Sequence, residues 1–163
     1  MIHDFQLQGW HFQYDAYRTR AFYEQLPPLQ TPLAENFRAT FCSFPPELAS
    51  LLKLMGANPA HPYQMMAGRC HLAEQEGEYI LSYPIRGHAY HNTTKQDIIL
   101  DIASVRLCVQ PAIEEAVSRV WGDEDSFCLE VSSLFFPWVL LTPTLQEVYA
   151  PPRGEWSCFP YPE

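Results

Sequence analysis

The alternation of apolar and polar residues is clearest over residues 63–87, where two strand-like arms flank a short loop. Residues 75–77 form this loop, and its glycine can take the left-handed conformation that three-residue hairpin loops require. The pattern therefore predicts a long antiparallel hairpin over 63–87. Because antiparallel partners keep a constant sum of residue numbers, the loop sets Arg69 opposite Tyr83.

Two further elements are expected at the start of the chain. Residues 1–8 alternate well enough to predict a short strand that Gly9 ends. Residues 13–26 contain neither glycine nor proline and place aromatic side chains at helical spacing. We expect a helix there, and Pro27 stops it because proline lacks the N–H that a helix needs.

Two short helices are predicted between this segment and the hairpin. Thr31 followed by Pro32 is a typical pair of N-cap and first helical residue, and the apolar spacing continues to Cys42. Residues 45–55 begin with prolines and carry a leucine-rich apolar stripe. Gly56 then supplies the left-handed residue that commonly ends a helix.

The segment 97–109 fits two structures. Its β-branched content favours a strand, yet Ile98, Ile102, Val105 and Val109 share one face of a helix. No clean period of two is present, so helix is our expectation, and the choice between helix and strand stays open at this point.

The last third of the chain shows four patterns. A helix is predicted over 111–121, because its apolar residues lie on one face and its first turn is acidic. Strict alternation predicts a strand over 126–132. Residues 134–141 fit either an edge strand or a buried irregular segment, because Pro137 cannot donate to a central ladder. A further short helix is expected over 142–149.

These elements predict one α+β domain over residues 1–163, in which several short helices pack on a small antiparallel sheet built around the hairpin. The Pro-rich and aromatic segment 151–163 is expected to lie extended across the surface. A recognition peptide for an aromatic groove is the alternative for this segment.

Composition narrows the classes of function. A chain of 163 residues that is 47% hydrophobic can bury a core, and its formal charge of -9 argues against nucleic-acid binding. The start resembles no signal peptide and no window is apolar enough to span a bilayer, so we expect a cytoplasmic protein without membrane contact. Five cysteines without metal-like spacing indicate reduced thiols; they are Cys42, Cys70, Cys108, Cys128 and Cys158.

Catalytic and cofactor motifs are absent from the sequence. It contains no Gly-x-Gly-x-x-Gly, Gly-Lys-Ser/Thr, Gly-x-Ser-x-Gly or His-Glu-x-x-His motif. We therefore assign no catalytic residue, no cofactor and no metal, and the balance favours a protein that is not an enzyme, although triads are defined by geometry rather than by local sequence.

The hairpin carries the strongest chemical constellation. The expected register places Arg69 and His71 on the same face as Tyr79 and Tyr83, where together they would line a pocket for a small acidic ligand. Cross-strand packing of Arg69 on Tyr83 is the structural alternative. Cys70 points to the opposite face from His71, which argues against a Cys-His dyad.

Three histidines form a weaker candidate. The same register brings His61 opposite His91, with His88 nearby, at the open end of the hairpin. A transition metal needs three or four ligands, and no cysteine pair or closely spaced carboxylate accompanies them. Half-exposed loop histidines are therefore the default interpretation.

Acidic residues gather in two places, the hairpin tip and the surroundings of the helix over 111–121. Such clusters are commonly solvated faces, but they also suit an interface that attracts a basic protein. A small acidic domain without catalytic motifs is similar in general character to immunity and inhibitor proteins, a likeness of class that no motif carries. Our leading hypothesis is thus a protein-binding inhibitor or immunity-type module, whose expected anchors are Glu74, Glu76, Glu78, Glu114, Glu115, Trp121, Asp123, Glu124 and Asp125.

Overall fold

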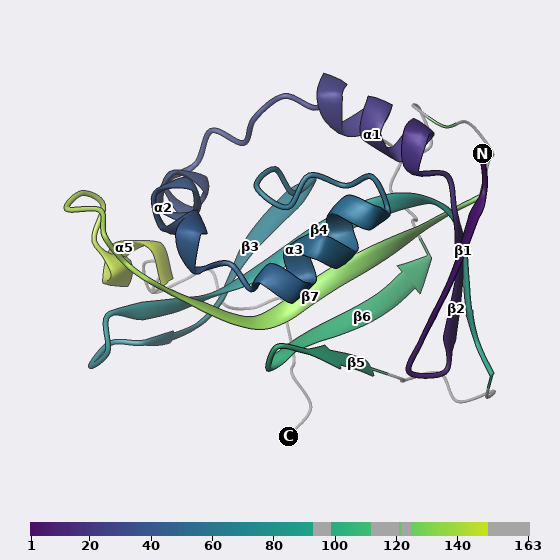
Figure 1. Cartoon of the computed structure of the whole chain (residues 1–163). Coiled ribbons are helices and arrows are strands. Elements are labelled where there is room, and N and C mark those ends of the chain that lie inside the picture. The colour runs from purple at the N-terminus through teal and green to yellow at the C-terminus, as the bar shows by residue number, and fades with distance from the viewer. Residues whose placement is uncertain (93–98, 112–120, 122–124, 150–163) are drawn as a thin grey trace.

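A seven-stranded antiparallel sheet forms the frame of the protein in the computed structural model (Figure 1), which describes residues 1–92, 99–111, 121 and 125–149. The hydrogen-bonded order is β1-β2-β4-β7-β6-β5, and β3 pairs separately with β4. The strands are β1 His3–Leu7, β2 Trp10–Tyr14, β3 Gln64–His71, β4 Glu76–His91, β5 Ile99–Ile102, β6 Val105–Pro111 and β7 Ser126–Pro137.

The helices are short and precede or follow the strands rather than alternating with them. Figure 1 shows α1, α2 and α3 together on one side of the sheet, with α5 at one end of the molecule. This confirms the expected α+β class, while the prediction of one domain over the whole chain stays a prediction. The helices are α1 Ala16–Gln25, α2 Pro32–Thr40, the 3-10 turn η1 Phe41–Ser43, α3 Pro46–Leu54 and α5 Leu145–Tyr149.

Strand β4 organises the sheet because it is 16 residues long and has partners on both edges. One edge pairs with β7 over residues 76–86. The other edge pairs first with β3 and then, from Gly87 onward, with β2. The odd-numbered residues of the middle of β4 are fully buried, namely Tyr79, Leu81, Tyr83 and Ile85.

Local capping signals place the helices as the sequence predicts. The Thr31 side chain accepts a hydrogen bond from the Ala34 N–H at 3.1 Å, and Pro32 is the first residue of α2. Gly56 has φ +88° just after α3, and a Cβ there would lie 2.2 Å from the Ala16 carbonyl oxygen. Both the left-handed backbone and the close contact with α1 therefore require glycine.

The predicted helix over 13–26 begins later than expected. Trp10–Tyr14 form β2, and Asp15 caps α1, so the N-terminal segment is a hairpin rather than a single strand. Gln8 and Gly9 turn it with φ of 49° and 83°. Two successive residues at positive φ are typical of the tight turns that match the twist of antiparallel strands.

The prediction of a helix over 97–109 is wrong. The described part of this segment is the β5–β6 hairpin, which Ala103 and Ser104 turn with φ of 52° and 66°. Leu100 and Leu107 face each other in the ladder and are fully buried. The β-branched composition was therefore the better signal, because long-range pairing with β7 stabilises a strand that local periodicity does not specify.

The strand expected over 126–132 is confirmed and extends to Pro137 as β7. β6 leaves β7 at Ser132, so the last part of β7 pairs only with β4. Pro137 thus lies at an edge, where a missing N–H costs no ladder hydrogen bond. The helix predicted to end at Tyr149 is present as α5.

The two ends of the sheet meet through one side chain. The Gln8 amide nitrogen donates to the Asp101 carbonyl at 2.9 Å, and its oxygen accepts from the Asp101 N–H at 3.3 Å. The β1–β2 turn therefore contacts β5. The rings of Phe12 on β2 and Phe127 on β7 also pack together, with their centroids 5.6 Å apart. The sheet curls around part of its own core.

Two predictions lie outside the described residues: the helix over 111–121, apart from its end residues, and the extended segment 151–163. In the described part of the chain, no helix is long and apolar enough to cross a membrane.

Candidate functional site

The predicted hairpin is present, but its register differs from the expectation. The turn occupies residues 72–75, and Ala67 pairs with Tyr79 rather than with Ile85. A β-bulge between Ala67 and Cys70 shifts the register again before the turn. Because the turn lies nearer the N-terminus than expected, every pairing counted from the expected loop is wrong, and the bulge displaces the pairs beyond it by one more residue.

The observed register separates the four residues of the expected ligand pocket. Tyr79 and Tyr83 are fully buried under the helices. Arg69 and His71 lie on the opposite face: the Arg69 guanidinium carbon is 5.6 Å from the centre of the Phe135 ring, and the His71 ring stacks on the same phenylalanine at 4.6 Å. These four residues therefore line no common face, and the pocket expected from them is not formed.

The bulge in β3 instead places hydrogen-bond donors of Arg69 around the Glu78 carboxylate. Its Oε2 atom accepts from both the backbone N–H and the Nε–H of Arg69 at 3.0 Å, and its Oε1 accepts from the Ser133 N–H at 2.8 Å. Burial raises the pKa of Glu78, but these hydrogen bonds outweigh burial and hold the pKa below its ordinary value. Glu78 is thus a structural group, not part of an exposed acidic tip.

The other two acidic residues of the tip face solvent. Glu74 is exposed and Glu76 is half-buried, and neither has an ion-pair partner in the part of the chain that the structure describes. Leu72 in the same turn is 49% exposed. The Trp138 N–H donates to the Gln75 carbonyl at 2.8 Å, which ties the turn to the segment after β7.

The loop between β7 and α5, residues 138–144, presents apolar side chains to solvent. Val139 is 52% exposed and Leu141 is 92% exposed. The loop is nevertheless well anchored, because the Trp138 Nε1–H donates to the Pro143 carbonyl at 3.0 Å. Thr144 and Glu147 then form a capping box, in which the Thr144 N–H donates to the Glu147 carboxylate at 2.6 Å.

Figure 1 shows the β3–β4 turn, the 138–144 loop and α5 at the same end of the molecule. We call this surface the acidic end. It combines exposed apolar side chains, which can serve as contact points for a partner, with carboxylates, which can attract a basic one. Its members are Leu72, Glu74, Glu76, Val139, Leu141 and Glu147.

The second expected acidic focus is only partly described. Trp121, an expected anchor, is 8% exposed and packs 4.9 Å from the Phe22 ring, so it belongs to the core. Asp125 is exposed and contacts His88. The remaining residues of that focus lie outside the described residues; they are Glu114, Glu115, Asp123 and Glu124.

The three histidines do not converge. His61 Nε2 lies 3.1 Å from the Pro27 carbonyl, far from the position opposite His91 that the expected register assigned to it. His91 pairs with Trp10 and His88 with Gln13 across β2. Among described residues, no three His, Cys, Asp or Glu side chains are grouped to hold a metal ion.

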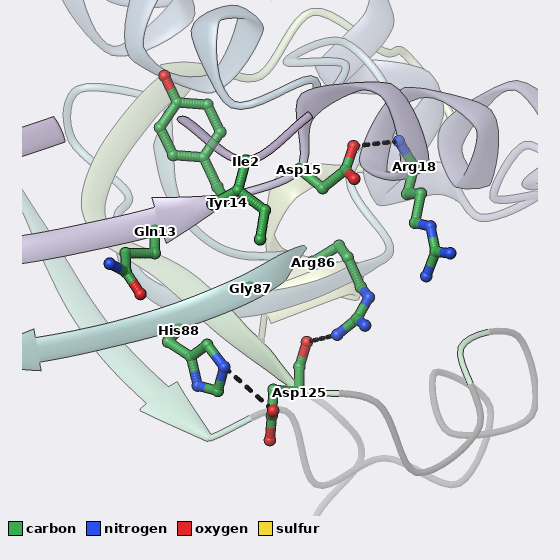
Figure 2. Close-up of a pocket in the computed structure, with 9 residues that line it drawn as sticks. All are labelled: Ile2, Gln13, Tyr14, Asp15, Arg18, Arg86, Gly87, His88 and Asp125. Atoms are coloured by element: carbon green, nitrogen blue, oxygen red, sulfur yellow. Dashed lines mark hydrogen bonds and ion pairs between the residues drawn. The ribbon is translucent and has the colours of Figure 1, made fainter. Parts of the chain in front are cut away.

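A pocket that sequence reasoning missed lies where β2, α1, β4 and the start of β7 meet (Figure 2). Its cavity volume is about 320 Å³. Gly87 makes the close approach of β4 to β2 possible, since it has φ +140° and a Cβ there would lie 1.9 Å from the Gln13 carbonyl oxygen. The lining residues are Ile2, Gln13, Tyr14, Asp15, Arg18, Arg86, Gly87, His88 and Asp125.

Contacts within the chain hold these polar groups in place. His88 Nε2 lies 3.0 Å from the Asp125 carboxylate, and the Arg86 guanidinium donates to the Asp125 carbonyl, as Figure 2 shows. Burial raises the pKa of Asp15, yet the hydrogen bond from the Arg18 N–H and the nearby N-terminal ammonium bring it below its ordinary value. The pocket thus contains charges of both signs, and local sequence patterns do not reveal it because its lining residues come from four separate stretches of the chain.

Comparison with protein-family models, with curated proteins and with solved structures gives no match to this chain. The candidate sites therefore depend on the geometry of this protein alone.

Proposed function

We propose that the protein is a binding module of the inhibitor or immunity type, which neutralises a basic protein partner by forming a stoichiometric complex at the acidic end. The observation that carries this proposal is the scarcity of arginine or lysine partners for carboxylates among the described residues. Among ion pairs between described residues, only Arg69–Glu78 joins an arginine or lysine to a carboxylate, in a chain of formal charge -9. Uncompensated carboxylates repel one another and attract a basic surface.

The acidic end suits such a partner better than the rest of the described surface does. Leu141 is almost fully exposed on a loop whose backbone is fixed by Trp138. Holding an apolar side chain in water stabilises nothing within the chain, but it presents a preorganised anchor that costs little entropy on binding. Glu74 and Glu76 then supply the charge that steers a basic partner toward this anchor.

A charge-reversal experiment tests the proposal. Affinity capture from the cells that produce the protein identifies the partner, and its association rate with purified wild-type protein is then measured at several salt concentrations. We expect a basic partner at one-to-one stoichiometry. The double variant E74K/E76K is expected to associate about tenfold more slowly at low salt, with a weaker dependence on ionic strength.

A matched control separates local from global charge. The variant E24K/E47K changes the net charge by the same amount on α1 and α3, and both residues are exposed. It should bind at nearly the wild-type rate. Equal slowing by both double variants would show that the acidic end is not the interface, and a partner that carries no basic surface would contradict the proposed function itself.

Binding of a small polar ligand is a second candidate function, and the pocket in Figure 2 is the observation that favours it. Its volume of about 320 Å³ lies at the lower end of the range for ligand sites. Screening small zwitterionic and neutral polar compounds by NMR tests this idea. A ligand should shift the amide signals of Gly87 and His88, and signals that stay unchanged across the screen would count against it.

A further inference from the structure

A hydrogen-bonded array lies on the solvent-facing side of β1, β2 and β4, beside the pocket of Figure 2. His11 Nε2 is 3.0 Å from Asp4 Oδ1, and His11 Nδ1 is hydrogen-bonded to the Tyr90 hydroxyl. The Gln13 amide nitrogen donates to the same Asp4 oxygen at 3.1 Å. The ladder explains the convergence, because His11 pairs with Tyr90 and Asp4 pairs with Gln13.

The partners determine where the protons lie. An ionised aspartate only accepts hydrogen bonds, so the contact with Asp4 requires the proton of neutral His11 on Nε2. Nδ1 then carries the lone pair and accepts from the Tyr90 O–H. Asp4 in turn is oriented by Gln13. The order carboxylate, imidazole, hydroxyl is the arrangement that activates a hydroxyl nucleophile in enzymes of several unrelated folds.

We propose that Tyr90 is an activated nucleophile, and hence a covalent modification site, toward small electrophiles that carry a leaving group. In the reaction, the Tyr90 oxygen forms a bond to the electrophilic centre while the bond to the leaving group breaks and the leaving group departs with its electron pair. The phenolic proton passes to His11 Nδ1. Asp4 is the positioning residue that stabilises the resulting imidazolium.

Accessibility permits this chemistry. Tyr90 is 47% exposed, and the His11 side chain beneath it is 21% exposed. Tyr17 on α1 offers an internal comparison, because it is 77% exposed and its hydroxyl forms no hydrogen bond with a described residue. If exposure alone decided reactivity, Tyr17 would react faster than Tyr90. If the base decides, the order is reversed.

An arylsulfonyl fluoride is the probe. Attack at sulfur forms an S–O bond, breaks the S–F bond and releases fluoride, and peptide mapping by mass spectrometry gives the rate at each tyrosine. We expect Tyr90 to react at least about tenfold faster than Tyr17 near neutral pH. This factor is smaller than the one a general base usually contributes in a closed active site, because Tyr90 is exposed to solvent. H11N and D4N should lower the Tyr90 rate and leave the Tyr17 rate unchanged, while D4E restores part of the Tyr90 rate.

The pH profile distinguishes a base from a merely structural neighbour. Among the described residues, the ionisable groups on this face are Asp4, His11, Arg86, His88, Tyr90 and Asp125. In wild-type protein the ratio of the Tyr90 rate to the Tyr17 rate should be largest near neutral pH and shrink under alkaline conditions, where hydroxide can replace His11 as the proton acceptor at either tyrosine. In H11N the ratio should stay flat. Equal rates at both tyrosines, or an H11N variant that reacts as fast as wild type, would overturn the proposal.

Discussion

The buried carboxylate of Glu78 provides the sharpest test of how this sheet is stabilised. Glu78 is 6% exposed and accepts three hydrogen bonds, two from Arg69 and one from Ser133. Replacing it with glutamine preserves the shape but turns an amide NH₂ group toward one of these donors. Each hydrogen bond to a charged group contributes about 1.5–3 kcal/mol, so E78Q should lower the free energy of unfolding by about 2–4 kcal/mol.

The substitution Arg69→Ala separates the contribution of the Arg69–Glu78 ion pair from that of the backbone hydrogen bonds to Glu78. The Arg69 side chain is 70% exposed, and exposed ion pairs contribute about 0–1 kcal/mol. R69A also keeps the backbone N–H that bonds Glu78. It should therefore cost about 1 kcal/mol or less, clearly below E78Q. Urea unfolding monitored by circular dichroism measures both variants.

The pH dependence of E78Q supplies an independent check. The folded-state pKa of Glu78 is lowered, so its contribution to stability is fully present above about pH 4.3, the pKa of an unfolded glutamate, and is lost as the pH falls through the folded-state value. The difference between wild type and E78Q should shrink in that acidic window. A difference that stays constant there, or an R69A variant as unstable as E78Q, would refute the claim that backbone hydrogen bonds to the Glu78 carboxylate stabilise the fold.

Three further predictions concern Glu130, Asn36 and Gly87. Burial raises the pKa of Glu130, so E130Q should increase the free energy of unfolding at neutral pH by up to about 0.5 kcal/mol. This gain should fade at acidic pH, where the wild-type carboxyl is protonated. Urea unfolding at two pH values measures the difference. Asn36 is fully buried and bonds the Tyr79 hydroxyl at 2.8 Å, so N36A should cost about 2–4 kcal/mol in thermal or urea unfolding. G87A should weaken the β2–β4 ladder, since its Cβ would strike the Gln13 carbonyl, and faster amide exchange in β2 would reveal this.

Elements specified by local chemistry were predictable from the sequence. Thr31 caps α2 through its own side chain, and Gly56 ends α3 because the left-handed backbone needs glycine. The existence of the hairpin over 63–87 likewise follows from its alternation, and its two arms are β3 and the first part of β4. These features depend on residues within one or two turns of each other.

Features that depend on distant partners were not predictable. The register of the hairpin depends on where its turn lies and on a bulge beside Gly68, which packs against Glu78: a Cβ at Gly68 would lie 2.6 Å from a carboxylate oxygen of Glu78. The β5–β6 hairpin owes its form to β7, and the contact of His11 with Tyr90 exists only because β2 joins β4. No local pattern encodes such pairings, since a shift of a few residues changes every neighbour.

The length of β4 makes the two proposals separable. Glu76 begins the strand at the acidic end, whereas Tyr90 lies almost at its other end, roughly 45 Å away along an extended strand. Substitutions at such a distance share no contacts and should act additively. Y90F should therefore abolish labelling at residue 90 without changing partner association, and adding it to E74K/E76K should leave the slowing factor of that double variant unchanged. Coupling between the two effects would mean that the partner reaches the Tyr90 face, and the interface would then extend along β4.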